Sequence, residues 1–169
     1  MIAIKNILAA TDFSDSGDAA LRYGMELARR FDASLHVLHV VDEIAAHPHA
    51  VAGLPMDTGL LQTTLEESAR ANLARLVPEP DRSSLRARLE VEVSAWPGHT
   101  ILAYARDAAI DLIIVGTHGR KGLEGLLLGS VARLVARTAT CPVLTVRAHS
   151  RDFILPDALQ KVDSTSIAG

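Results

Sequence analysis

Short apolar runs alternate with longer amphipathic stretches along most of this chain, and that alternation restricts the fold more than any other feature. Five runs have the length and the branched residues expected of β-strands. They are Ile2–Ala10, Ser34–Val41, Leu85–Val93, Leu112–Val115 and Pro142–Val146. Strands that alternate regularly with helices favour right-handed crossovers and a parallel sheet. The sequence therefore predicts an α/β fold: an open, parallel, five-stranded sheet with helices on both faces.

The stretches between these runs carry apolar residues at helical spacing. Helices are expected near residues 20–31, 61–76, 97–109 and 130–139. The segment Asp42–Asp57 shows no period and is interpreted as a long connection. In Leu85–Val93, apolar and charged residues alternate strictly, which is typical of a strand with one charged face. We therefore expect that strand at an edge of the sheet.

Length and charge limit what the protein can be. At 169 residues the chain has the size of one domain. Its net charge of -3 offers no basic surplus for a polynucleotide, so nucleic acid is not an expected partner. No run approaches the roughly 20 apolar residues of a membrane helix, and a single cysteine, Cys141, fits a reducing compartment. We expect a cytoplasmic protein without membrane contact, in which Cys141 is a buried structural thiol.

A glycine-rich stretch, Gly116–Val131, follows the fourth apolar run directly and leads into the last predicted helix. Glycine lets the backbone approach a ligand closely, and a helix N-terminus offers N–H groups and a positive dipole end to an anion. This arrangement favours phosphate binding. The alternative is a flexible connection whose glycines only allow tight turns.

A second loop, Thr11-Asp12, follows the first predicted strand. In open α/β sheets, ligands bind at the carboxyl ends of strands whose crossovers leave to opposite sides. If the first and fourth strands are neighbours there, Asp12 and the glycine-rich stretch face one site, and the Asp12 carboxylate can accept from a base N–H. The chain contains neither a G-x-x-x-x-G-K-[ST] phosphate loop nor a G-x-G-x-x-G fingerprint.

Several of these segments resemble the universal stress protein family. The spacing G-x2-G-x9-G-S, from Gly116 to Ser130, looks like the ATP-binding signature of that family. The other matching segments are Ala10–Ser14, Leu38–Asp42, Asp111–Arg120 and Cys141–Arg147. The resemblance covers about residues 2–147. One departure is Trp96-Pro97-Gly98, where the family more usually has Gly-x-Pro.

The resemblance implies a sheet of order 3-2-1-4-5, as in adenine nucleotide alpha hydrolase-like folds. It implies one domain over residues 1–147, with a tail at 148–169 that is partly docked or disordered. ATP or AMP would be the ligand, with Mg²⁺ accompanying ATP, and Asp12 and Val40 would contact adenine. Gly116 would lie near the ribose. The other expected site residues are Gly119, Gly129, Ser130 and Val131 at the phosphates, together with Ala10, Thr11, His118 and Arg120.

Dimers of the family commonly pair through the last strand, so a homodimer through Pro142–Val146 is expected. The resemblance favours a regulatory or sensor dimer of the stress response that binds adenine nucleotide and is not an enzyme beyond slow ATP hydrolysis. Hydrolysis usually needs a carboxylate that holds magnesium, and Asp12 is expected at the base instead. Two alternatives stay open: a hydrolase or phosphotransferase using the same site, and a dimeric interaction module in which the nucleotide is structural.

Some residues also have a structural interpretation. Asp12 could cap the first helix. Arg120 with Lys121, and Arg133 with Arg137, could be solvated basic pairs.

The histidines do not predict a metal site. His36 and His39 are three residues apart on a strand, so they point to opposite faces. His47 and His49 could join His118, but no cysteine or carboxylate framework supports them.

Overall fold

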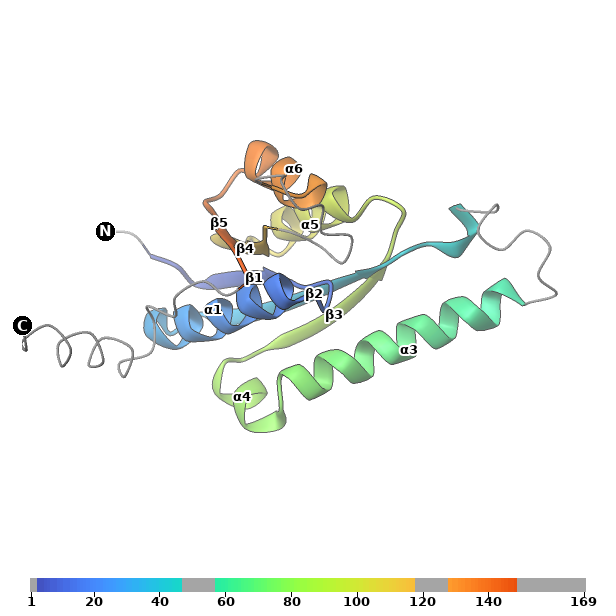
Figure 1. Ribbon diagram of the computed structural model, residues 1–169. Helices are drawn as coiled ribbons and strands as arrows, with labels where there is room; N and C mark the ends of the chain where they lie inside the picture. The colour runs from blue at the N-terminus through green and yellow to red at the C-terminus, as the bar shows by residue number, and fades with distance from the viewer. Residues whose placement is uncertain (1–2, 47–56, 118–127, 149–169) are drawn as a thin grey trace, which may run out of the picture.

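Five parallel strands form one sheet in the order β3-β2-β1-β4-β5, which confirms the predicted architecture (Figure 1). The structure is a computed structural model, and it describes residues 3–46, 57–117 and 128–148. In chain order the elements are β1 (Asn6–Ala10), α1 (Asp15–Phe31), β2 (Ser34–Val41), η1 (Ile44–Ala46), α3 (Thr58–Leu76), α4 (Glu79–Ser84), β3 (Arg88–Val93), α5 (Pro97–Asp107), β4 (Leu112–Gly116), α6 (Ser130–Thr138) and β5 (Val143–Val146).

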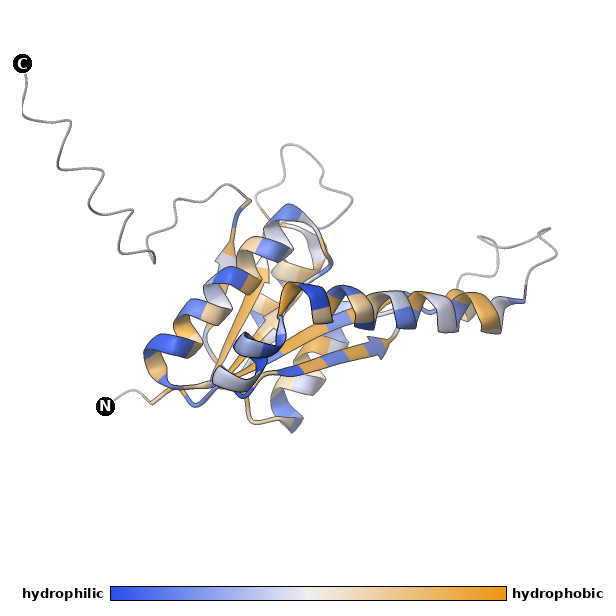
Figure 2. Ribbon diagram, turned by 90° about the horizontal axis from the view of Figure 1, so that it is seen from below, coloured by the Kyte–Doolittle hydropathy of each residue, from blue (hydrophilic) through white to orange (hydrophobic). Residues whose placement is uncertain are grey.

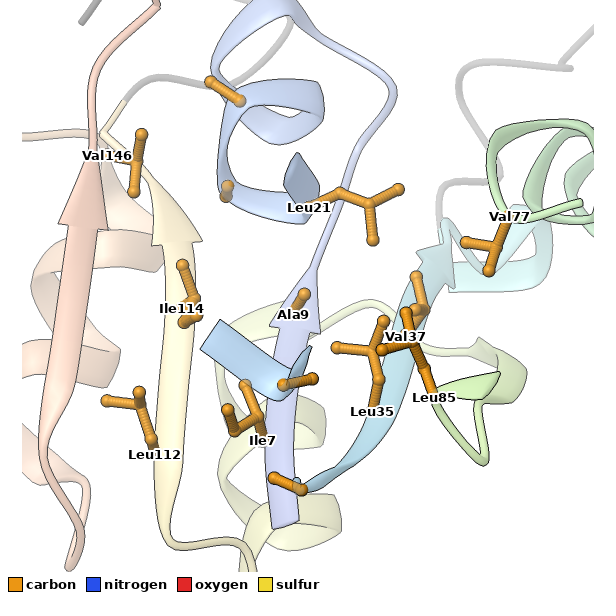
Figure 3. Packing of buried hydrophobic residues seen from close by; sticks show 14 of the residues in the cluster. Ile7, Ala9, Leu21, Leu35, Val37, Val77, Leu85, Leu112, Ile114 and Val146 are labelled. Atoms are coloured by element: carbon orange, nitrogen blue, oxygen red, sulfur yellow. The ribbon is translucent and has the colours of Figure 1, made fainter. Parts of the chain in front are cut away.

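Helices cover both faces of the sheet, as predicted (Figure 1). α1 and α3 pack on one face, and α5 and α6 pack on the other. The strands can serve both layers because successive side chains point to opposite sides. In β1, Ile7 contributes to the cluster under α1, whereas Leu8 contributes to the cluster under α5 and α6. Figure 3 shows the first cluster, in which side chains of β1, β2 and β4 lie beside Leu21 of α1.

β1 and β3 are shorter than the sequence predicts. β1 begins only at Asn6, and β3 begins at Arg88 rather than Leu85. Leu85 instead closes the short helix α4, where its N–H donates to the Asp81 carbonyl at 2.9 Å. Arg86 then adopts a left-handed φ of 47°. The chain therefore turns just before β3 enters the sheet, and β3 does lie at an edge.

α1 begins at Asp15, earlier than its apolar stripe predicts. Ser14 is the N-cap, and its Oγ accepts from the Gly17 N–H at 3.2 Å. Gly17 therefore lies inside the helix, not in the preceding turn. The capping role considered for Asp12 belongs to Ser14.

The first half of α3 extends beyond the sheet (Figures 1 and 2). Ala69 and Leu73 are buried against the body of the protein, whereas Leu60 and Leu65 are exposed. Within the three described ranges, no helix combines the length and apolar character needed to cross a membrane. Of the predicted long connection, η1 is described, but residues 47–56 lie outside the described ranges, as does most of the predicted tail.

Candidate functional site at the carboxyl edge of the sheet

The carboxyl ends of β1 and β4 lie side by side, as the site prediction requires. Ala10 pairs with Val115, the last residue before Gly116. α1, which follows β1, covers one face of the sheet, while α6, which follows β4, covers the other. The two crossovers thus leave to opposite sides, and the Thr11-Asp12 loop and the chain after Gly116 start from the same point of the edge.

A network of short hydrogen bonds fixes the turn Thr11–Ser14. The Phe13 N–H donates to Thr11 Oγ1 at 3.0 Å, and the Ser14 N–H donates to Asp12 Oδ1 at 3.1 Å. Ser14 Oγ donates to the same carboxylate oxygen at 2.5 Å. Phe13 is held at a φ of 62°, a conformation that is uncommon outside glycine. One oxygen of Asp12 is thus used within the turn.

His39 supports this turn from inside the protein. Its side chain is buried, and Nδ1 lies 2.8 Å from the Thr11 carbonyl oxygen. A carbonyl can only accept, so the proton of His39 sits on Nδ1. The imidazole also lies against the Phe13 ring, with 4.2 Å between the ring centroids. Sequence reasoning missed this role, although a histidine near the carboxyl end of an apolar strand was the available signal.

Gly116 has a packing reason to be glycine. A Cβ atom built there would lie 2.7 Å from the carbonyl carbon and from Oγ of Ser16, in the first turn of α1. Gly17 is equally crowded, because its Cβ would lie 2.8 Å from Asp12 Oδ1. These two glycines let α1 begin directly against β4 and the turn. The predicted ribose contact at Gly116 stays a prediction beside this structural role.

The N-terminus of α6 is tied to the same edge. The Thr117 N–H donates to the Val146 carbonyl at 2.8 Å, and the Gly129 N–H donates to the Thr117 carbonyl at 2.6 Å. Gly129 is the N-cap residue, and no side chain in the part of the chain that the structure describes caps the helix. The N–H groups of the first turn, at Ser130 and Val131, therefore have no side-chain cap from residues 3–46, 57–117 or 128–148. His118, Gly119, Arg120 and Lys121 lie outside the described residues, so their predicted contacts stay predictions.

Apolar residues predicted for the site meet on the face covered by α5 and α6. Ala10, Val40 and Val131 are partly buried and pack against one cluster of that face. They come from β1, β2 and α6, three elements that are far apart in the sequence. Together with Asp12 and Ser130, they place an apolar surface, a carboxylate and an uncapped helix at one edge of the sheet.

The remaining titratable groups point to structural roles. His36 and His39 do lie on opposite faces, and His36 Nδ1 is 2.8 Å from the Tyr104 hydroxyl of α5. Burial lowers the pKa of His36, and the Arg88 cation acts in the same direction. Burial also raises the pKa of the Cys141 thiol. Among the described residues, no group of three His, Cys, Asp or Glu side chains could hold a metal, whereas His47, His49 and His118 lie outside them.

Comparisons with known proteins agree with the family resemblance and with the fold described above. The model of the universal stress protein family matches residues 3–147. One relative, universal stress protein MJ0531 of Methanocaldococcus jannaschii, is 31% identical over 150 residues, which cover 88% of this chain and 85% of the relative. Among solved structures, universal stress protein UspA from Lactobacillus plantarum has a TM-score of 0.74 at 28% identity. That match covers 87% of this chain and 100% of the other.

Two further solved structures share the fold at lower identity. A universal stress protein from Archaeoglobus fulgidus in complex with dAMP is 22% identical, with a TM-score of 0.54 over 86% of this chain and 99% of the other. A universal stress protein in complex with cAMP is 23% identical, with a TM-score of 0.60 over 87% and 99%. At these identities the likeness shows the fold alone, and the ligands belong to those two proteins.

Proposed function

The chain belongs to the universal stress protein family, and we propose that it binds an adenine nucleotide, ATP or AMP, as a regulatory or sensor protein of the stress response. One observation carries this proposal. The uncapped N-terminus of α6 lies at the same sheet edge as the rigid Thr11–Ser14 turn, at the point where the crossovers diverge. The dAMP and cAMP complexes of two proteins with this fold support the choice of an adenine nucleotide.

The phosphate half of the proposed site uses backbone groups. At the start of α6, the N–H groups of the first turn and the helix dipole both favour an anion. The Ser130 hydroxyl is exposed and can donate to a phosphate oxygen as well. Gly129 has φ -64° and ψ 162°, which any residue can adopt, so the backbone conformation does not explain the glycine. Glycine also brings no side-chain acceptor of its own to the first-turn N–H groups, which this proposal assigns to a phosphate.

The adenine half of the proposed site is apolar with a polar edge. Ala10 and Val40 are partly buried side chains on the α5 and α6 face, and they offer a surface on which a base can rest. Asp12 follows Ala10 by two residues, in the turn after β1, and its carboxylate would accept from a base N–H. Adenine presents such a donor at its exocyclic amine.

We propose binding rather than catalysis as the main role. A triphosphate hydrolase usually places a magnesium-holding carboxylate beside the phosphates. Asp12 is the acid predicted for this site, and one of its oxygens is engaged by Ser14. Magnesium would then arrive with ATP, held by the phosphates, and any hydrolysis would be slow. Turnover of several ATP molecules per second would contradict this proposal.

We also propose that two copies of the chain pair through β5. β5 (Val143–Val146) is the edge strand next to β4, so one side of its backbone has no strand partner within the described sheet. Unpaired edges are the usual place for strand addition. Size-exclusion chromatography with light scattering tests this proposal, since a monomeric mass at micromolar concentration would contradict it.

The sharpest test of nucleotide binding is Gly129→Asp. An Asp at the N-cap accepts from the first-turn N–H groups, which stabilises a helix by about a few tenths of a kcal/mol relative to glycine at that position. The same carboxylate would occupy the proposed phosphate position. We expect thermal stability to be kept or raised while ATP and AMP binding, measured by calorimetry, is lost.

The matched control is Ser84→Asp, which adds one negative charge at the end of α4, on the opposite face of the sheet from α6. It should leave nucleotide affinity unchanged. If wild-type protein binds neither ATP nor AMP at millimolar concentration, the proposal is wrong. It is also wrong if Gly129→Asp binds both as tightly as wild type.

A further inference from the structure

β3 forms an outer edge of the sheet, and one side of its backbone has no strand partner within the described sheet (Figure 1). The Ser94 N–H donates to the Val41 carbonyl at 3.0 Å, so Ser94 and the even-numbered residues before it direct their backbone groups to β2. The odd-numbered residues, Leu89, Val91 and Val93, therefore direct theirs to the open side. A further strand can form ladder hydrogen bonds there.

The charged side chains on either side of Leu89 have a self-complementary order. The sequence from Arg86 to Glu92 is R-A-R-L-E-V-E, with two bases before Leu89 and two acids after it. Arg86 already bridges to an aspartate. Arg88, Glu90 and Glu92, by contrast, form no ion pair or side-chain hydrogen bond among the described residues. Their charges are thus available to a neighbour at the open edge.

A second copy of β3 satisfies this order when it runs antiparallel, with the two Leu89 residues opposite each other. In that register Arg88 of each copy lies opposite Glu90 of the other. Because Leu89 directs its backbone outward, the two Leu89 residues exchange N–H···O bonds, and Arg88 and Glu90 form the non-hydrogen-bonded pairs, in which side chains are closest. Centring the pair on Glu90 instead would place two carboxylates face to face, and like charges directly opposite each other destabilise a sheet. The charges therefore favour the pair centred on Leu89.

The apolar face of β3 also fits a second copy. Leu89 and Val91 are only partly buried against the cluster under α1 and α3, and Val93 is 36% exposed. A two-fold axis perpendicular to the sheet brings the α3 of the second copy to the same face, beside the α3 that already packs on β3. A free peptide strand would bring no such helix. The occupant that fits both faces is therefore a second copy of the chain.

We infer that two copies of the chain pair through β3, antiparallel and centred on Leu89, with Arg88 of each copy facing Glu90 of the other. Charged side chains usually keep an edge strand unpaired. Here their order excludes unrelated strands and admits one antiparallel copy. This pairing is independent of nucleotide binding and of the pairing proposed at β5, since β3 and β5 are opposite edges of the sheet. Dimers formed at one edge can still join at the other, so the assembly grows with concentration.

Sedimentation equilibrium of the full chain, from micromolar to millimolar concentration, tests this pairing. β3 has only six residues and buries little area, so the association is expected to be weak. The variants are Arg88→Glu, Glu90→Arg and the double variant, in which the two charges are exchanged. Arg106→Glu is the matched control for the change of charge, since the Arg106 side chain on α5 is 74% exposed and contacts the neighbouring Asp107. Circular dichroism of each variant checks that the fold is kept.

At the highest concentration we expect wild type and Arg106→Glu to have an average mass at least about twice that of either single variant, because each single variant places like charges opposite each other. The double variant should regain the wild-type mass. An equimolar mixture of the two single variants should regain it too, since a copy with two acids then faces a copy with two bases.

Two results would overturn the inference. Equal masses for wild type and both single variants would show that β3 does not pair. If the double variant and the mixture keep the mass of the single variants, the contact between Arg88 and Glu90 is wrong, and the inferred pairing with it.

Discussion

Gly116→Ala separates two explanations of the same glycine, a packing role and a ribose contact. In the structure a Cβ at this position lies 2.7–2.8 Å from the carbonyl carbon, carbonyl oxygen and Oγ of Ser16. Ordinary contact begins near 3.4 Å, so the first turn of α1 would have to move by about 0.7 Å. Two of the three atoms belong to the backbone, so a change of side-chain rotamer cannot relieve the clash.

Overpacking of this kind typically costs about 1–3 kcal/mol. With a urea m-value of about 2 kcal/mol/M, a loss of about 2 kcal/mol lowers the unfolding midpoint by about 1 M. Far-UV circular dichroism is the suitable probe, because the single tryptophan, Trp96, is 69% exposed in the fold and would report unfolding poorly. Nucleotide affinity is measured on the same samples.

The control is Gly59→Ala near the start of α3. There the nearest atom to a new Cβ is a single side-chain oxygen, the N-cap oxygen of Asp57 at 3.2 Å, so a shift of a few tenths of an ångström is enough. Alanine is favoured over glycine within helices by up to about 1 kcal/mol, so this variant should keep or raise the midpoint. If Gly116→Ala leaves the midpoint at the wild-type value but weakens nucleotide binding, the packing argument is refuted and the ribose contact is the better explanation.

Three further predictions concern His39 and His36, which are buried, and Cys141, which is half-buried. His39→Leu leaves the Thr11 carbonyl without its imidazole donor, so we expect the free energy of unfolding in urea to fall by about 1–3 kcal/mol. An unchanged unfolding midpoint would contradict the role of His39 in supporting the Thr11–Ser14 turn. Because burial and Arg88 lower the pKa of His36, the fold binds fewer protons than the unfolded chain just below the ordinary value near pH 6.5. The free energy of unfolding should therefore fall as pH is lowered from about 7 toward the folded-state pKa. In His36→Gln the free energy of unfolding should depend less on pH. The same pH dependence in wild type and His36→Gln would contradict this. Since burial raises the pKa of Cys141, its alkylation at neutral pH should be slow in native protein and fast in urea, and equal rates would show that the thiol is accessible.

The sheet was predictable because its signals are local. Each strand is a short apolar run, and the charged face of β3 predicted an edge position that the sheet order confirms. The order of the inner strands came from the resemblance, since periodicity alone says nothing of which strands are neighbours. α4 escaped prediction because Pro78 and Pro80 look like helix breakers, although proline is acceptable in the first turn of a helix, where N–H groups lack partners anyway.

The glycines of the site show why the rest required the structure. Gly116 and Gly129 belong to one spacing motif, and in the sequence they look equivalent. Gly116 is explained by Ser16, a residue a hundred positions away that only the pairing of β1 with β4 brings close. Gly129 has no strained backbone angle to explain it, and the helix that it precedes is left uncapped. A residue kept small for packing predicts a loss of stability on substitution. A residue kept small to leave N–H groups open predicts a loss of binding with stability kept, so Gly116→Ala and Gly129→Asp should give opposite results in the same two assays.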